Sequence, residues 1–345
     1  MNRLTKRLLP ALAALACLTA CPAARAADAA MIEAAKKEGV VVWYTSQIIN
    51  QLVIPVATAF EKKYGVKVEY VRANTGDIVI RIDQEAKASK VLADVFDGTS
   101  PVAVLKPRNL VMKWVPDAAK DFPPGLVDPE GYWIADYIFI VVAAVNTDLV
   151  KAGTEPRGWQ DILDPKWRSK MAWSSIPSSS AAPGFVGLVL REYGEDRGLA
   201  YLKQLAAQRI AGIPTATRQV LDQVIAGEYP IALQAVNHHA VYSSSRGAPV
   251  KWLPFEPGMV NLGAVSVTAG APHPNAAKLL VDFLVSEEGQ TIFRDNDYLP
   301  ANPKVPVRDP SMIPGPKTFR GEVFTPEQIE AGMKRWETIF ADLFR

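Results

Sequence analysis

The first hundred residues alternate between two hydrophobic patterns, one typical of buried strands and one typical of amphipathic helices. Residues 40–44 form a continuous apolar run, as in a strand buried on both faces, and residues 66–71 and 93–96 are two further strand candidates. Between these runs, apolar residues recur at helical spacing over residues 56–64 and 78–86. The order strand, helix, strand, helix, strand predicts a parallel sheet with helices on both faces.

A second set of such elements follows residue 134. Apolar runs predict its strands, and helical spacing predicts its helices. The expected strands cover residues 138–145, 171–174, 229–233 and 265–268, and the expected helices cover residues 199–207, 217–226, 276–284 and 326–344. A chain of 345 residues is too long for one average core, so this α/β pattern favours two lobes.

Small polar residues, many with hydroxyl groups, follow each strand of the first set. In parallel sheets, ligands gather at the carboxyl ends of the strands, so these loops form a candidate binding edge. Ordinary loop polarity explains any one of them, but three such loops at one edge favour a site. The candidate ligand contacts are Tyr44, Thr45, Ser46, Thr75, Gly76, Thr99 and Ser100.

Two features of the second set suggest recognition of an anion. Ser178, Ser179 and Ser180 precede a helix that we expect to begin near Pro183, where hydroxyls, free N–H groups and the helix dipole can hold an anion. Alternatively, one serine caps the helix and the others are ordinary loop. Arg218, at the start of the helix over residues 217–226, can pair with a carboxylate or phosphonate, or it can be a solvated helix end.

The N-terminus has the three parts of a secretory signal in the right order. Three basic residues precede a short apolar stretch, and Ala24-Arg25-Ala26 is a small-x-small cleavage site. We therefore predict a signal peptide over residues 1–26 and a periplasmic protein. The alternative is a lipoprotein tethered at Cys21, because Leu18-Thr19-Ala20-Cys21 resembles a lipobox.

Removal of this segment would change the charge and the cysteine content of the chain. The segment holds four of the 38 basic residues and no acidic one, which leaves 34 basic against 36 acidic residues. No basic patch argues for a nucleic-acid partner. Both cysteines, Cys17 and Cys21, lie in the segment, so the released form would have no disulfide, cysteine metal site or cysteine nucleophile.

The sequence lacks the motifs of common secreted hydrolases. It contains no Gly-x-Ser-x-Gly elbow and no His-Glu-x-x-His helix, so catalysis would lack clear machinery. We expect a binding protein that is not an enzyme and needs no cofactor. A secreted hydrolase that uses one of the cleft serines is the alternative from another class.

The block over residues 271–290 resembles the signature of periplasmic solute-binding proteins of the ferric-iron-binding type. It begins with APHPNAAK, continues through VDFL and ends in SEEGQ. Other segments resemble the same family in the same order and extend the resemblance over nearly the whole chain after the signal. They are residues 42–46, 60–65, 93–96, 146–148, 227–230, 247–250 and 299–300.

The resemblance implies a type II periplasmic binding fold. In this fold two α/β lobes, each a mainly parallel sheet flanked by helices, are joined by two crossover strands and close by a hinge over a ligand in the cleft. The expected crossings lie near residues 132–138 and 253–263, the first lobe comprises residues 27–134 and 262–298, and the second comprises residues 135–261 and 299–345. The implied partners are a small-molecule ligand and the permease and ATPase of an ABC importer. We expect a monomer, and signalling to a membrane receptor is an open alternative to import.

The resemblance leaves the ligand open. Ferric-binding members use two adjacent tyrosines, which suit Fe(III), but the corresponding segment here carries His238 and His239 after Asn237, with Tyr242 nearby. Adjacent histidines on a strand face opposite sides, so a shared ligand requires a turn or a helix start. We expect these four residues to contact a small polar, anionic ligand together with the loops above. The alternative is ferric iron or another metal, with His238, His239 and Tyr242 as its ligands.

Overall fold

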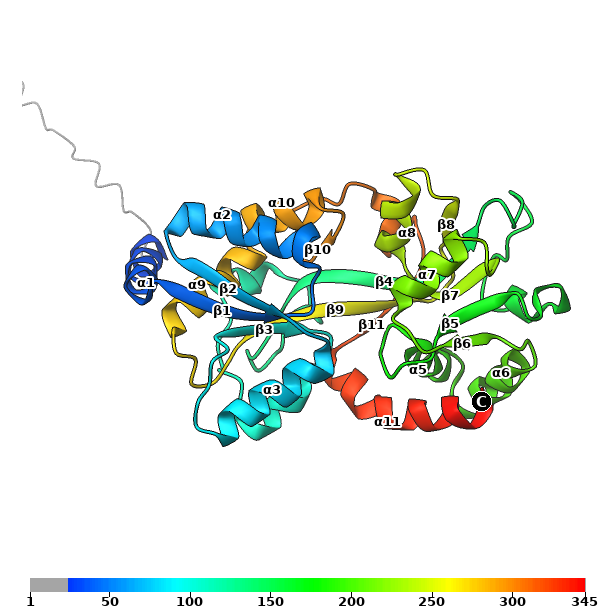
Figure 1. Cartoon of the computed structure of the whole chain (residues 1–345), viewed down its shortest axis with the longest axis horizontal. Coiled ribbons are helices and arrows are strands. Elements are labelled where there is room, and N and C mark those ends of the chain that lie inside the picture. The colour runs from blue at the N-terminus through cyan, green and yellow to red at the C-terminus, as the bar shows by residue number, and fades with distance from the viewer. Residues whose placement is uncertain (1–23, 345) are drawn as a thin grey trace, which may run out of the picture.

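The structure, a computed structural model, describes residues 24–344 and contains two α/β lobes bridged by long strands (Figure 1). The strands of this part of the chain form one eleven-stranded sheet with the order β2-β1-β3-β9-β4-β7-β5-β6, in which β8 and β10 pair with β4 and β11 pairs with β9. The strands are β1 (Val40–Thr45), β2 (Lys67–Arg72), β3 (Val95–Gly98), β4 (Ile134–Asn146), β5 (Met171–Ser174), β6 (Ala211–Ile213), β7 (Ile231–Val236), β8 (Val250–Leu253), β9 (Gly258–Val267), β10 (Leu299–Pro300) and β11 (Gly321–Phe324).

Helices cover the sheet on both sides, with α2 and α10 on one side of the first-lobe strands and α3 on the other (Figure 1). The helices are α1 (Ala24–Glu38), α2 (Ile54–Tyr64), α3 (Thr75–Lys87), α4 (Pro101–Leu105), α5 (Ala182–Tyr193), α6 (Glu195–Ala206), α7 (Thr217–Ile225), α8 (Asn237–Ser244), α9 (Pro274–Val285), α10 (Glu287–Asp295) and α11 (Pro326–Leu343). A π-helical segment, Ile49–Val53, leads into α2. Short 3-10 segments cover Lys106–Arg108, Asp117–Asp121, Asp161–Leu163, Pro165–Trp167 and Pro310–Met312.

The first lobe has the parallel sheet that its hydrophobic pattern predicts. Strand β1 runs parallel to β2 on one side and to β3 on the other. Its apolar run places Val41 and Trp43 fully inside the core. Helix α2 buries Phe60 and ends at Gly65, whose φ of 71° is left-handed, as a helix C-terminus favours. The carboxyl ends of β1 and β3 therefore lie together at one edge of the sheet.

Strands β4 and β9 pass from one lobe into the other. They pair antiparallel from Ile134 opposite Val265 to Val141 opposite Met259, and this pairing overlaps both ranges in which the crossings were expected. Ile134 and Val265 belong to the first-lobe core, whereas Val141 and Met259 belong to the second-lobe core. One pair of strands therefore connects the two cores, and the predicted two-lobed α/β fold is confirmed.

Helix α11 belongs to the second lobe but reaches back to the first. Helix α11 packs against α5 of the second lobe. Its first turn begins with a capping box, in which Thr325 and Gln328 satisfy each other's backbone N–H groups. From that turn, Glu327 accepts a hydrogen bond of 2.8 Å from the indole N–H of Trp133, which lies in the first-lobe core. The start of α11 is thereby held next to the space between the lobes.

The N-terminal predictions fall largely outside the described residues. These begin at Ala24, so Cys21 and all but the last three residues of the predicted signal peptide lie before them. Within the described part of the chain, none of the helices has the length and hydropathy needed to cross a membrane.

Candidate functional site

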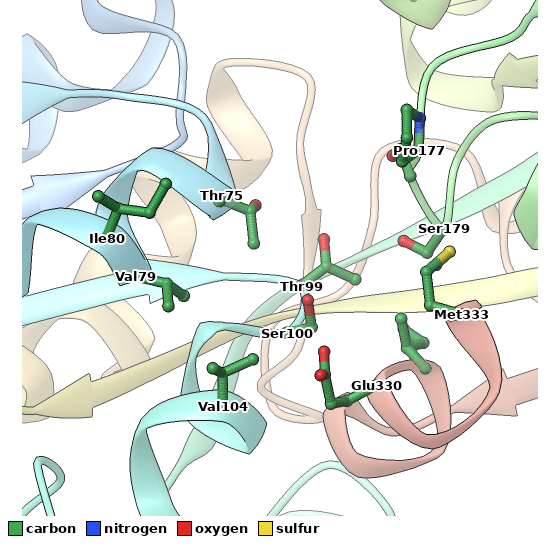
Figure 2. A pocket seen from close by; sticks show the side chains of 13 residues that line it. Thr75, Val79, Ile80, Thr99, Ser100, Val104, Pro177, Ser179, Glu330 and Met333 are labelled. Carbon is green, nitrogen blue, oxygen red and sulfur yellow. The ribbon is translucent and has the colours of Figure 1, made fainter. Parts of the chain in front are cut away.

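A cavity of about 390 Å³ lies between the lobes, within the size range of small-molecule sites (Figure 2). It is lined from the first lobe by the start of α3 and by the loop between β3 and α4. The second lobe contributes the loop before α5 and the first turns of α11. The lining residues are Thr75, Gly76, Val79, Ile80, Thr99, Ser100, Val104, Pro177, Ser178, Ser179, Ile329, Glu330 and Met333.

The first-lobe wall consists of two strand-end loops that contact each other. Thr75 is the first residue of α3, and Thr99 and Ser100 follow β3 directly. Gly98 makes this junction possible, because its φ of 147° is one that L side chains rarely adopt. A Cβ at Gly98 would also lie 2.8 Å from the ring of Pro101 and 3.2 Å from the Thr75 hydroxyl. The close contact brings the hydroxyls of both loops to one wall of the cavity.

The second-lobe wall is the serine loop in front of α5. The hydroxyls of Ser178 and Ser180 lie 3.1 Å apart and pair with each other, and Ser179 lines the cavity. Gly184, in the first turn of α5, lets the loop fold back, because a Cβ there would meet the Ser179 carbonyl oxygen. The N-cap of α5, Ala181, supplies no side-chain acceptor. The N–H of Ala181 donates to the Ser178 carbonyl oxygen at 3.2 Å, which closes the loop directly before the helix.

The hydroxyls of the two lobes face each other across the cavity. In Figure 2 the side chains of Thr99 and Ser100 point toward the space between the lobes from one side, and Ser179 points toward it from the other. Helix α11 closes the lower side, where the carboxylate of Glu330 points toward Ser100. The lining contains no lysine, arginine or histidine. Its polarity therefore comes from hydroxyls, from the N-terminus of α3 and from one carboxylate.

The end of β1 has a different role from the one predicted for it. The side chains of Tyr44 and Thr45 are buried, and neither they nor Ser46 are among the residues that line the cavity. The Tyr44 hydroxyl donates to Glu85 at 2.5 Å, and burial raises its pKa to about 12. Ser46 donates from its backbone N–H and its hydroxyl to Asp97. These polar groups are occupied by contacts inside the first lobe.

Two buried carboxylates lie on β3 and β4, and neither was among the candidate ligand contacts predicted from the sequence. Asp97 accepts hydrogen bonds from the Trp43 indole at 2.8 Å and from Ser46, and Asp136 accepts one from Gln47 at 2.6 Å. The second carboxylate oxygen of Asp136 has no partner. Burial raises the pKa of both groups, and the charge of Asp97 raises that of Asp136 further. The sequence signal that could have pointed to Asp136 is its position as an aspartate inside the apolar run that forms β4.

Arg218 and the histidine segment lie outside the lining of the cavity. Arg218 forms an ion pair of 2.7 Å with Asp222, one turn further along α7. Asn237 starts α8, so the adjacent histidines stand at a helix start, which is the arrangement that a shared ligand requires. Asn237 uses its amide internally, because its oxygen accepts from the His238 N–H and its nitrogen donates to the Met312 carbonyl.

The histidine rings are packed against each other and against an aromatic neighbour. The ring of His238 lies 4.6 Å from that of His239 and 5.2 Å from that of Tyr298. The Nδ1 atoms of both histidines lack hydrogen-bond partners. Burial lowers the pKa of His239 to about 4 and that of His238 well below its usual range, so both rings are neutral at pH 7. The ring of Tyr242 packs against the guanidinium of Arg246, whose central carbon lies 3.5 Å from the ring centroid.

A metal centre needs several ligands that converge. Within residues 24–344, no three His, Cys, Asp or Glu side chains gather closely enough to hold a metal ion. The described residues thus offer two neutral imidazoles at α8 but no larger donor set around them.

The model of the family described as "Bacterial extracellular solute-binding protein" matches residues 73–320, which is most of the chain. The chain belongs to this family. The resemblance seen in the sequence is thereby confirmed, and the protein is a periplasmic solute-binding protein of the ABC-importer class.

Similar members of the family carry names that refer to different ligands. A putative 2-aminoethylphosphonate-binding periplasmic protein of Salmonella paratyphi A is 24% identical over 83% of this chain and 82% of its own. An Fe(3+)-binding periplasmic protein of Serratia marcescens is 25% identical over 86% of this chain and 90% of its own. The periplasmic binding protein AfuA of Actinobacillus pleuropneumoniae, solved with exogenous fructose-6-phosphate bound, is 26% identical. It superposes with a TM-score of 0.74 over 89% of this chain and 98% of its own.

Proposed function

We propose that this protein captures a small anionic solute in the cleft by hinge closure and delivers it to the permease and ATPase of an ABC importer. The observation that carries the proposal is the pair of hydroxyl walls, Thr75, Thr99 and Ser100 on one lobe and Ser178 and Ser179 on the other, around one cavity. A ligand favours the closed form only through contacts with both lobes, and this arrangement offers them.

The anionic character of the ligand is inferred from a helix end. Helix α3 begins at the cavity, where Thr75 and Gly76 line it, and the serine loop that lines the opposite wall leads into α5. The free N–H groups and positive dipole end of α3 favour an anion. The names of the relatives agree in part, because a phosphonate and a sugar phosphate both carry a tetrahedral oxyanion. Metal capture is a second candidate, favoured by the unpartnered Nδ1 atoms of His238 and His239.

The proposed lobes comprise residues 27–134 with 262–298 and residues 135–261 with 299–345. The hydrophobic cores support this division, since one core contains Ile134 and Val265 and the other contains Val141 and Met259. We also propose export to the periplasm through a signal peptide over residues 1–26, and action as a monomer. Lipidation at Cys21 is the alternative to release.

Binding without catalysis is the function that the serine loop supports. Ser178 and Ser180 pair with each other, and in the described part of the chain none of the three histidines forms a hydrogen bond with a serine hydroxyl. A serine nucleophile needs such a base to accept its proton.

A thermal-shift screen tests the proposed function. The purified protein would be melted with alkylphosphonates, sugar phosphates, organic acids, ferric citrate and Zn²⁺. A ligand present at 100 times its Kd should stabilise the protein by about 2.7 kcal/mol. Stabilisation by oxyanions and not by metals is the expected result. Stabilisation by metals alone would replace the anion by the second candidate, and turnover of a phosphate ester would contradict the binding function.

A further inference from the structure

Glu330 places an uncompensated negative charge in the cleft. It lies on α11, it is exposed, and its carboxylate points into the cavity toward Ser100 (Figure 2). Within residues 24–344 it has no ion-pair partner within 4.0 Å, and Lys334, one turn further along the helix, does not pair with it. Two other charged residues of α11 have partners, since Glu327 accepts from Trp133 and Arg335 pairs with Glu195.

A purely anionic ligand does not fit this charge. The N-terminus of α3 and the hydroxyls that would hold an oxyanion carry only partial positive charge, and the lining contributes no cationic side chain. A carboxylate in the same cavity repels a phosphonate or phosphate group, and the lower dielectric of a closed cleft strengthens that repulsion. The repulsion becomes attraction if the ligand itself carries a cation next to Glu330.

We propose that Glu330 selects a zwitterionic ligand, a phosphonate or phosphate monoester that also bears a primary ammonium group. This assignment rests on the proposed function and names its substrate class. The oxyanion would bind between Thr99, Ser100 and Ser179, and the ammonium would donate to the Glu330 carboxylate.

The remaining lining residues fit the part of such a ligand between its two charges. Val79 and Val104 on the first lobe and Met333 beside Glu330 on α11 supply apolar surface in the same cavity. A short alkyl chain can pack on this surface, whereas the hydroxyls of a sugar would lose water there without gaining partners. The cleft thus has separate surfaces for an oxyanion, a short alkyl chain and an ammonium.

Isothermal titration with matched ligand pairs tests the assignment. One pair is 2-aminoethylphosphonate and ethylphosphonate, and the other is O-phosphoethanolamine and ethyl phosphate. Each amino ligand should bind at least tenfold more tightly than its partner. Comparison of the two pairs separates a carbon–phosphorus ligand from a phosphate ester.

The variant Glu330→Gln keeps the size of the side chain and removes its charge. It should lose the tenfold preference for the amino ligands while binding the amine-free ligands at least as well as the original protein. Glu337→Gln is the matched control, since Glu337 lies on the same helix outside the cavity lining. Melting curves without ligand would check that both variants are folded.

The outcomes distinguish this assignment from the function on which it rests. If the amine-free ligands bind and the amino ligands bind no more tightly, or if Glu330→Gln keeps the preference, the assignment is overturned while anion capture stands. If none of the four ligands binds but another oxyanion of the thermal-shift screen stabilises the protein, the assignment is overturned and anion capture stands. If no oxyanion binds in either experiment, both fail.

Discussion

The ends of β1 and β3 lie next to each other in one parallel sheet, but their polar residues meet different partners. After β3, Thr99 and Ser100 face the cavity between the lobes. After β1, Thr45 is fully buried, and Ser46 donates to the carboxylate of Asp97. The difference comes from Asp97, which lies at the end of β3 and takes up the polar groups of the neighbouring loop. Hydroxyls at a strand end are therefore available to a ligand only where no buried acceptor has already bound them.

The largest expected effect is a loss of stability when the buried contacts of the loop after β1 are removed. The substitution Asp97→Ala leaves the N–H groups of Trp43 and Ser46 without acceptors, and each unsatisfied buried group costs about 1–3 kcal/mol. The free energy of unfolding, measured by urea denaturation, should fall by roughly 3 kcal/mol or more. The variant Asp97→Asn, which keeps one acceptor oxygen, should lose less. A loss below about 1 kcal/mol for Asp97→Ala would mean that Asp97 does not organise the β1 loop.

A matched pair of threonine substitutions tests the comparison directly. Thr99→Val removes a hydroxyl from the cavity and should weaken oxyanion binding by about 1.5–3 kcal/mol without changing the melting temperature. Thr45→Val removes the buried hydroxyl that accepts from the Gln47 N–H at 3.1 Å. It should lower stability by about 1 kcal/mol and leave the Kd within twofold. The same titration and melting curves measure both variants. If Thr99→Val lowered stability and Thr45→Val weakened binding instead, the conclusion that the β3 loop binds ligand and the β1 loop is structural would be contradicted.

The smallest expected effect is a pH dependence that comes from Asp136. Its pKa is raised in the folded protein, so the unfolded chain releases this proton at a lower pH than the folded protein does. As the pH rises from about 4, this group therefore makes folding progressively less favourable. Asp136→Asn should remove the penalty and give a higher free energy of unfolding than that of the original protein at pH 8. At pH 4 the two proteins should differ little, and equal pH profiles would show that Asp136 is ionised without cost.

Much of the cleft could be predicted from short-range patterns. Thr75 and Thr99 follow predicted strands, and Ser178 precedes a predicted helix, so general rules on sheet edges and helix ends place them at a site. The same rules also placed Thr45 and Ser46 among the candidate ligand contacts. A sequence does not show that the carboxylate of Asp97 turns toward this loop and accepts from Ser46.

Glu330 and Asp136 could not be found in this way. The apolar face of α11, which includes Trp336, indicates a packing role, and Trp336 is indeed buried. Only the long-range packing that holds the start of α11 beside Trp133 brings Glu330 to a cavity whose other walls lie far away in the sequence. Likewise, Asp136 gains its partner Gln47 only when β4 crosses between the lobes.

The contact between Trp133 and Glu327 gives the protein a built-in optical reporter. The indole N–H of Trp133, in the first-lobe core, donates to a carboxylate on a helix that packs against the second lobe. Indole emission depends on hydrogen bonding and on nearby charge. Rotation of one lobe against the other is therefore expected to change the fluorescence of Trp133. Opening and closing can then be followed in real time without an attached dye, with Trp133→Phe as the reference for the other seven tryptophans.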